Sequence, residues 1–295
     1  MRSLLSLTTL AIFLLAACQQ VGQDASQSGS GLSIQSDTRI VSLSGAMTEI
    51  LCLAGLEANI VGVDVTSTYP ASMQAVPKVG HNRNIQAEGI LSLNPTLVIG
   101  KEGGLKPEVE MQLRQTGVPL LLLTHTETIE GAQHLISQLA DTLGKPELAG
   151  RLNASIDESL NRVQPLTPAP RALFIYARGA GNLMVAGTGT QMELMLKLAG
   201  AEPVIKNFDG FKPYSPEALL AADPEAIVLF ESGLNSLEGE EGLLEVPGVA
   251  ETSAGRSGRF IAMDGQFVAG FGPRVGEAAL ALNQHLQQMM LAHGQ

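Results

Sequence analysis

Short apolar segments alternate with longer amphipathic segments over residues 39–291. The short segments are rich in Val, Ile and Leu, which is typical of buried strands in a parallel sheet, and the longer ones have helical periodicity. We predict strands at 39–43, 61–63, 96–99, 118–123, 172–176, 226–230 and 260–263, and helices at 48–53 (with Thr48 as a candidate N-cap), 127–143, 191–198 and 277–291. Because strands alternate with helices, the pattern predicts an α/β fold with parallel sheets.

Two parts of this pattern resemble each other. The segments LAGLE at 53–57 and LAGAE at 198–202 each follow an apolar helix. Further along, Glu88 precedes a proline by seven residues, and so does Glu217, and each proline leads into an apolar strand. Two matches in the same order predict two Rossmann-like lobes of similar topology, at 39–143 and 167–295.

One long helix is predicted between the lobes, within 144–166. Apolar residues recur there every three or four positions and form a single stripe along a helix: Leu148, Leu152, Ile156, Leu160 and Val163. Prolines follow soon afterwards and end the helical pattern. Two lobes joined by one helix form a clamp, so we expect the ligand in a cleft between the lobes.

The first 38 residues differ from the rest of the chain. Residues 1–18 have a basic start, a short apolar core and the ending Leu-Ala-Ala-Cys, which predicts a lipoprotein signal peptide with Cys18 acylated. An ordinary signal peptide with a chance cysteine is the alternative. Residues 19–38 are rich in Gly, Ser and Gln and predict a flexible tether. We therefore expect the protein in the periplasm or cell envelope, held at a membrane surface by its lipid anchor.

Composition excludes several classes of protein. A net charge of −11 over 295 residues argues against a nucleic-acid partner, which requires a basic surface. Two cysteines are too few for a disulfide framework or a multi-cysteine zinc site. The five histidines lack tight ligand spacing, which disfavours a bare-metal binder. The chain has no G-x-S-x-G, H-E-x-x-H or GK[ST] motif, so we do not expect an enzyme.

The first lobe has the longer connection after its second strand. From Leu53 to Glu88 the chain advances 35 residues, against 19 from Leu198 to Glu217. The additional residues include TSTYP at 66–70 and VGHNRN at 79–84, which are polar and turn-like. Because loops that follow parallel strands face the ligand crevice, we expect these two segments to contact the ligand.

The same two segments, together with RIVSLSGAMTEILCLAGL at 39–56 and AGFGPR at 269–274, resemble substrate-binding proteins of ABC transporters for iron chelates. The resemblance covers nearly all of 39–291 and is strongest to the haem-binding branch. It implies that the chain captures haem (ferric protoporphyrin) as cargo and delivers it to the permease and ATPase subunits of an importer. The same fold with a ferric siderophore or a corrinoid as cargo is the alternative.

The resemblance also implies roles for residues around the cargo. Tyr69 occupies the position of the iron ligand, and a phenolate is a hard oxygen donor that suits ferric iron. Arg83 could donate to that phenolate or pair with a haem propionate. His81 is a candidate second axial ligand. Some relatives have a second histidine ligand near the position of Arg178. An arginine cannot bind iron, so the resemblance favours five-coordinate iron bound by Tyr69 alone. Arg178 is then a candidate propionate partner.

Three further features have two interpretations each. Arg274 could face the cleft as a propionate partner, or pair with an acidic residue between the lobes. Tyr214 and Phe271 could pack on a porphyrin face, or belong to the core. Glu88 and Glu217, one in each lobe, match the acidic residues that meet an arginine pocket on the permease in the wider group, and favourable charge at a helix start is the alternative.

Overall fold

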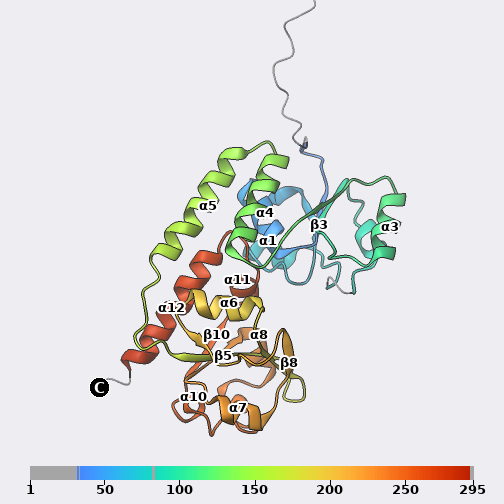
Figure 1. The fold of residues 1–295 in the computed structure, drawn as a ribbon. Coiled ribbons are helices and arrows are strands. Elements are labelled where there is room, and N and C mark those ends of the chain that lie inside the picture. Colours follow the sequence, from blue (N-terminus) through green and yellow to red (C-terminus); the bar gives the residue numbers. More distant parts are fainter. Residues whose placement is uncertain (1–31, 33, 82–83, 293–295) are drawn as a thin grey trace, which may run out of the picture.

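Four short strands form the sheet of the first lobe in the computed structural model, which describes residues 32, 34–81 and 84–292 (Figure 1). They are β1 (Ile40–Ser42), β2 (Ile60–Val63), β3 (Leu97–Lys101) and β4 (Leu120–Leu123). The strand order is β2-β1-β3-β4, and every pairing is parallel. β1 and most of β3 are buried, as expected for strands covered on both faces.

Helices cover both faces of this sheet. One face packs against α1 (Gly45–Leu53) and α4 (Ile129–Thr142), and the other against α2 (Ala87–Leu91) and α3 (Pro107–Gln115). The connections contain two 3-10 helices, η1 (Glu57–Asn59) and η2 (Ala71–Ala75). The prediction of Thr48 as an N-cap is wrong, because α1 begins at Gly45. Thr48 is fully buried inside α1, and its hydroxyl donates to Ser42 Oγ (2.8 Å).

The sheet of the second lobe is mixed. Its strands are β5 (Arg171–Ala177), β6 (Leu183–Ala186), β7 (Glu202–Pro203), β8 (Phe211–Pro213), β9 (Ala226–Phe230) and β10 (Phe260–Met263). The order is β10-β9-β5-β6-β8, with β7 also paired to β5. The predicted parallel part, β10-β9-β5, is confirmed. β6 runs antiparallel to both β5 and β8, which was not predicted.

Helices also cover both faces of the second sheet. α6 (Gln191–Leu198) and α12 (Val275–Leu291) belong to the larger core, which continues into the first lobe. The opposite face packs against α7 (Pro216–Ala222), α8 (Glu231–Ser236), α9 (Glu240–Leu244) and α10 (Ser253–Arg256). After β10 the chain forms α11 (Gly265–Ala269) at the end of the sheet that is nearer to the first lobe (Figure 1).

The internal repeat is visible in the backbone. α1 and α6 both end at the leucine of the repeated LAG segment, and the glycines that follow, Gly55 and Gly200, have φ of +82° and +81°. In both, the next amide donates back into the last turn: Leu56 to the Leu51 carbonyl and Ala201 to the Leu196 carbonyl, each at 3.0 Å. Glycine tolerates this left-handed conformation, so the repeated segment is a shared helix terminus.

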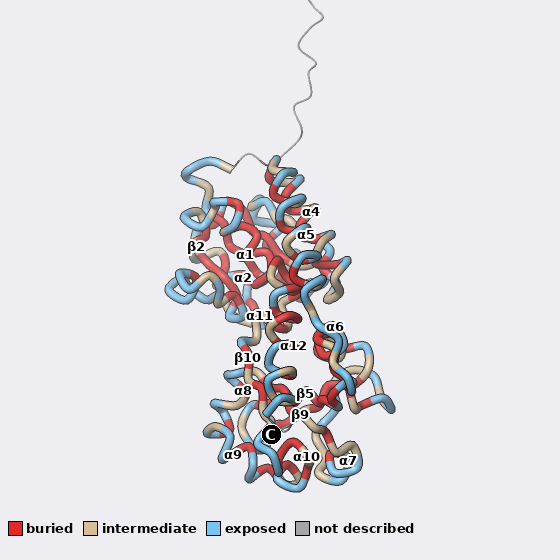
Figure 2. Tube along the Cα trace, turned by 90° about the vertical axis from the view of Figure 1, so that its left-hand side faces the viewer, coloured by how far each residue is buried: buried red, intermediate tan, exposed pale blue. Residues whose placement is uncertain are grey.

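A single helix, α5 (Pro146–Asn161), connects the lobes and packs against α4 and α12. Its apolar stripe is confirmed for Leu148, Leu152 and Ile156, which are buried in a core that continues from the first sheet to the second. Leu160 is partly buried, and Val163 lies beyond the end of the helix. Gly276 permits the close approach of α12, because an added Cβ would lie 2.5 Å from the Ile156 carbonyl oxygen. Figure 2 shows that buried segments are concentrated in the strands and in the helices facing them.

Part of the predicted tether lies within the described residues and contacts the first lobe. The Leu32 amide donates to the Thr142 carbonyl (2.6 Å), and Asn59 Nδ2 donates to the carbonyls of Gln35 (3.0 Å) and Thr38 (2.9 Å). Cys18 and residues 19–31 lie outside the described residues. Among the helices formed by residues 34–81 and 84–292, none has the length and apolar character needed to cross a bilayer.

Candidate functional site

Tyr69 lies in the first lobe, on the loop between β2 and η2, and is 42% exposed. A buried polar cluster forms the base of this loop. The fully buried Asp64 carboxylate accepts from the Thr66 amide (3.0 Å) and from the hydroxyls of Thr66 and Ser67. Ser67 Oγ lies 3.0 Å from Thr48 Oγ1, on α1. Because these buried polar groups satisfy one another, they fix residues 64–67 and so the start of the loop.

Lys78 extends this base toward the next loop. Its Nζ donates to the carbonyls of Ser67 (2.7 Å) and Met73 (2.9 Å). Burial lowers the pKa of Lys78, and the Asp64 carboxylate acts in the opposite direction. The Val65 amide donates to the Gly80 carbonyl (3.0 Å), so the loop carrying Tyr69 and the segment leading to His81 are hydrogen-bonded to each other.

Gln266, on α11 of the second lobe, binds the Tyr69 loop directly. Its Oε1 accepts from the Thr68 amide (2.6 Å), the Thr68 hydroxyl (3.0 Å) and the Tyr69 amide (2.8 Å). Its Nε2 donates to the Gly45 carbonyl at the start of α1 (3.1 Å). The backbone at Tyr69 is therefore held by a side chain from the other lobe.

Arg274, also from the second lobe, contacts the ring of Tyr69. Its guanidinium carbon lies 3.5 Å from the Tyr69 ring centroid and 5.0 Å from that of Phe267. Arg274 Nε and Nη2 donate to the two carboxylate oxygens of Glu49 on α1, at 2.7 and 3.1 Å. Of the two interpretations of Arg274, the one observed is the ion pair with an acidic residue of the other lobe. This two-pronged geometry fixes the guanidinium plane against the tyrosine.

The Glu49–Arg274 pair is largely withdrawn from solvent, with side chains 4% and 19% exposed. Burial is the largest influence on the Glu49 carboxyl and raises its pKa, while the hydrogen bond and charge of Arg274 lower it. A charge this deeply buried is tolerated only with a hydrogen-bonded partner.

A second polar contact joins the lobes beside this pair. His125, just after β4, is buried, and its Nε2 donates to the Phe271 carbonyl (3.0 Å). Burial lowers the pKa of His125. Phe271 is fully buried and has a φ of +43°, so it belongs to the core, and its interpretation as a porphyrin contact is wrong.

Tyr214 is also explained by packing. It is half-buried against the core of the second lobe, and its hydroxyl donates to the Pro247 carbonyl. Burial is the main cause that raises the pKa of Tyr214 to about 12. The ring and the hydroxyl of Tyr214 are therefore both engaged in contacts within the second lobe.

The other predicted ligand-binding residues are only partly placed. Arg83 lies outside the described residues. His81 is half-buried, and its carbonyl accepts from the Asn84 amide (2.6 Å). Arg178 is exposed in the turn after β5, with its guanidinium carbon 5.3 Å from the Tyr176 ring centroid. Because β5 and β10 are parallel to β9, Arg178 and α11 follow the same edge of the sheet.

Glu88 and Glu217 are exposed in the first turns of α2 and α7, which belong to different lobes (Figure 2). Glu217 accepts from the Ser215 hydroxyl (2.7 Å), and this hydrogen bond is the main reason for the lowered pKa of Glu217. The N-cap of α7 is the Ser215 hydroxyl, which accepts from the Ala218 amide. Neither glutamate is the capping residue of its helix.

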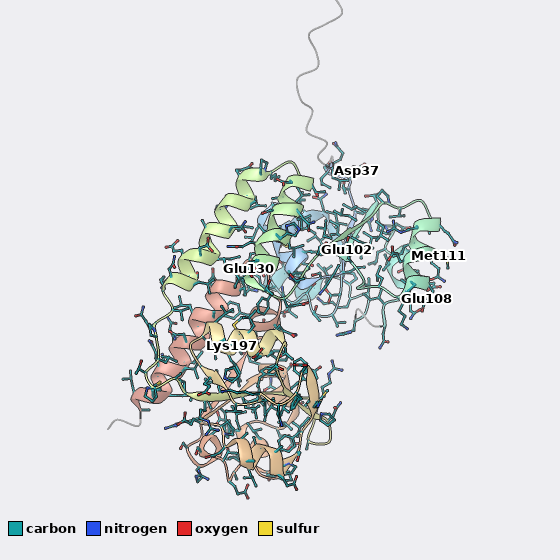
Figure 3. The ribbon with its side chains drawn as sticks, viewed as in Figure 1. Asp37, Glu102, Glu108, Met111, Glu130 and Lys197 are labelled. Carbon is teal, nitrogen blue, oxygen red and sulfur yellow. The ribbon has the colours of Figure 1, made fainter. Side chains whose placement is uncertain are left out.

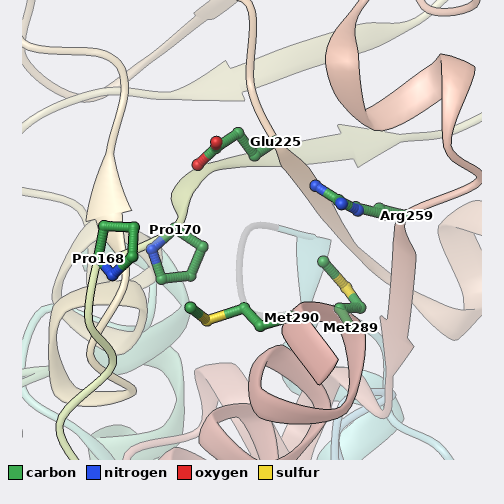
Figure 4. Close-up of a pocket in the computed structure, with 6 residues that line it drawn as sticks. All are labelled: Pro168, Pro170, Glu225, Arg259, Met289 and Met290. Atoms are coloured by element: carbon green, nitrogen blue, oxygen red, sulfur yellow. The ribbon is translucent and has the colours of Figure 1, made fainter. Parts of the chain in front are cut away.

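Two cavities in the described part of the chain lie away from Tyr69. The first, of about 160 Å³, is lined by Pro168, Pro170, Glu225, Arg259, Met289 and Met290 (Figure 4). The second, of about 470 Å³, lies between α7 and the β6–β8 region of the second lobe. The first is smaller than the roughly 300 Å³ at which pockets for drug-sized ligands begin, whereas the second exceeds that volume but is lined by residues of the second lobe alone. Neither cavity is lined by the side chains around Tyr69 at the boundary between the lobes, and these side chains form the candidate site.

Two site residues were missed by sequence reasoning. Glu49 carried a usable signal, because a carboxylate inside an otherwise apolar helix requires a partner on burial. Gln266 carried none, since the short helix α11 was not predicted. Among residues 32, 34–81 and 84–292, no group of three or more His, Cys, Asp or Glu side chains is arranged to hold a metal ion.

Comparison with known proteins agrees with this architecture. Residues 40–267 match the family described as periplasmic binding protein. The fold is similar to the periplasmic heme-binding protein RhuT from Roseiflexus sp. RS-1 in its apo form, with a TM-score of 0.82 and 38% identity, covering 86% of this chain and 99% of that one. Other solved periplasmic heme-binding proteins match with TM-scores of 0.78, 0.76 and 0.74.

Two curated relatives are more distant. An uncharacterized ABC transporter substrate-binding lipoprotein of Bacillus subtilis (strain 168) is 26% identical over 256 residues, covering 84% of this chain and 79% of the relative. A vitamin B12-binding protein of Vibrio campbellii is 29% identical over 196 residues, covering 66% of this chain and 70% of the relative.

Proposed function

The chain belongs to the periplasmic binding protein family, which its sequence matches over 40–267, and we propose that it captures haem and delivers it to an ABC-type importer. One observation carries the proposal: an exposed tyrosine lies on a hydrogen-bonded loop at the boundary between the lobes, in a chain 38% identical to a heme-binding protein of the same fold. A phenolate oxygen is a ligand that ferric haem accepts.

Within this proposal, Tyr69 binds the haem iron and arginines bind the propionates. Arg178 is available for this role because its side chain is exposed at the sheet edge that also leads to α11. Arg83 is the corresponding candidate of the first lobe. We assign Arg274 a different role, because its guanidinium already donates to both carboxylate oxygens of Glu49. The same guanidinium packs against the Tyr69 ring. His81 is the candidate for a sixth iron ligand.

Delivery requires a partner that contacts both lobes. We assign this to Glu88 and Glu217, which are exposed at equivalent helix starts, one in each lobe. Carboxylates so placed match a pair of basic pockets on a permease. The protein acts as a transport component without a reaction of its own, and the partner ATPase hydrolyses ATP.

The location proposed is the periplasm or cell envelope. Acylation of Cys18 would hold the two lobes at a membrane surface, and the B. subtilis relative is named a lipoprotein. Metabolic labelling with a fatty acid tests this anchor: a labelled wild type and an unlabelled Cys18→Ser variant are expected, and equal labelling would contradict it.

A corrinoid is the second candidate cargo, favoured by the 29% identity to a vitamin B12-binding protein. Titration of residues 19–295 with ferric haem and, separately, with cobalamin distinguishes the two. The haem proposal predicts saturable one-to-one binding of haem and much weaker binding of cobalamin. Tight cobalamin binding without saturable haem binding would overturn the haem assignment and leave the family and the transport role unaffected.

A further inference from the structure

One side chain of the second lobe closes a bridge between two segments of the first. Gln266 Oε1 accepts three hydrogen bonds from Thr68 and Tyr69, while Nε2 of the same amide donates to the Gly45 carbonyl. The fit is close on the Gly45 side, because a Cβ added there would lie 3.1–3.2 Å from the Gln266 side chain. The amide is thus held at both ends and oriented toward the tyrosine.

We propose that Gln266 is a positioning residue that couples the ligand geometry of Tyr69 to the contact between the lobes; this inference rests on the proposed function. Gln266 touches the backbone of Tyr69 and acts on the cargo only through that tyrosine. Haem binding is therefore sensitive to how the second lobe sits against the first.

The division of hydrogen bonds along the loop supports this assignment. Asp64, from within the first lobe, satisfies the loop as far as Ser67. The next two amides, those of Thr68 and Tyr69, donate across the boundary to a single oxygen of Gln266. Backbone amides at such a boundary require an acceptor, and water can replace Gln266 when the lobes separate. The start of the loop keeps its support in that case, whereas the backbone at Tyr69 loses it.

The ring of Tyr69 depends on the same boundary. Arg274 stacks on it at 3.5 Å and follows α11, the helix that carries Gln266. Backbone and ring are thus both held from the second lobe. A permease that draws the lobes apart would withdraw these two contacts together and loosen the iron ligand at the moment of delivery.

The test uses two substitutions at Gln266, of which one removes the acceptor for the Tyr69 loop and the other keeps it. Gln266→Leu removes the acceptor at similar size. Gln266→Glu keeps an acceptor oxygen for Thr68 and Tyr69, but it replaces the donation to the Gly45 carbonyl by a carboxylate oxygen and adds a negative charge. Gln133→Leu is the matched control, because Gln133 is also half-buried and makes a side-chain hydrogen bond, to Asp157 (2.8 Å), away from the site.

Three measurements are made on each variant: amide hydrogen exchange of Thr68 and Tyr69 in the haem-free protein, the tyrosinate-to-iron charge-transfer band of the haem complex, and haem loss to apomyoglobin. For Gln266→Leu we expect faster exchange at both amides, a shifted band and roughly tenfold faster haem loss. Gln266→Glu should keep the wild-type band, and Gln133→Leu should match wild type in all three.

The outcomes separate this inference from the proposed function. If wild type shows the charge-transfer band and Gln266→Leu leaves the band, the amide exchange and the haem loss unchanged, the inference is overturned and the proposed function is unaffected. Equal changes in Gln133→Leu and Gln266→Leu would overturn it too, since they would reflect general destabilisation. Absence of a Tyr69-dependent band in the wild type would overturn the proposed function and the inference with it.

Discussion

The Glu49–Arg274 pair should couple the two lobes energetically. Removing one member of a buried ion pair destabilises proteins by about 3–5 kcal/mol, because the remaining charge stays buried without a partner. Arg274 retains 19% exposure of its side chain and its contact with the Tyr69 ring. We therefore expect Glu49→Leu to lower the free energy of unfolding by about 3 kcal/mol, the low end of that range.

A double-mutant cycle in urea measures the coupling itself. Arg274→Met alone leaves a buried carboxylate without its partner, whereas the double variant Glu49→Leu/Arg274→Met removes both charges of the pair. The double variant should therefore be more stable than the sum of the single effects implies, with a coupling energy of about 2 kcal/mol. Strict additivity of the two single effects would refute the interpretation that this ion pair contributes to the junction.

The same pair predicts a pH dependence. Burial raises the pKa of Glu49 above its usual 4.5, so the native state binds a proton that the unfolded chain has already released. The contribution of Glu49 to stability therefore falls as the pH rises from 4.5 through the raised native pKa. Glu49→Gln should remove this fall, which unfolding curves recorded over that pH range would detect. A slope that persists in Glu49→Gln would show that another group causes the pH dependence.

Two further predictions concern docking and His125. Reversing Glu88 and Glu217 to Lys should abolish uptake but spare haem binding. The control reverses Glu108 and Glu130, exposed acidic residues in the first turns of α3 and α4 (Figure 3), and should spare both uptake and haem binding. Normal uptake in the Glu88 and Glu217 variant would contradict the docking role. Because burial lowers the pKa of His125, its contribution to stability should be present above pH 6.5 and be lost as the pH falls through the native pKa; His125→Gln should flatten this dependence in urea unfolding, and a persisting slope would contradict it.

Sequence patterns were sufficient to predict the strands and helices that belong to the internal repeat. The apolar runs at β1, β3, β9 and β10 and the stripe of α5 carry strong periodicity, so their positions follow from burial alone. The antiparallel strands β6 and β8 were missed because they have only four and three residues, and β8 is also mostly exposed. Short elements of this kind depend on tertiary pairing, which leaves little periodicity in the sequence.

The candidate site was less predictable than the fold. Tyr69 could be found because its loop is an insertion relative to the second lobe and resembles a known family. Its partners Gln266 and Arg274 are 197 and 205 residues further along the chain, and the pairing of Arg274 with Glu49 is set by how the lobes pack. No local pattern encodes contacts of this kind, since they arise only when α11 reaches the start of α1.

Binding of the haem iron by Tyr69 is the step on which the proposed function depends. It can be measured directly by the visible absorption spectrum of the ferric haem complex of residues 19–295, for wild type, Tyr69→Phe and the control Tyr214→Phe. We expect a high-spin spectrum with a tyrosinate-to-iron charge-transfer band in wild type and Tyr214→Phe, and loss of that band in Tyr69→Phe. The same spectrum in all three proteins would contradict the assignment of Tyr69 as the iron ligand.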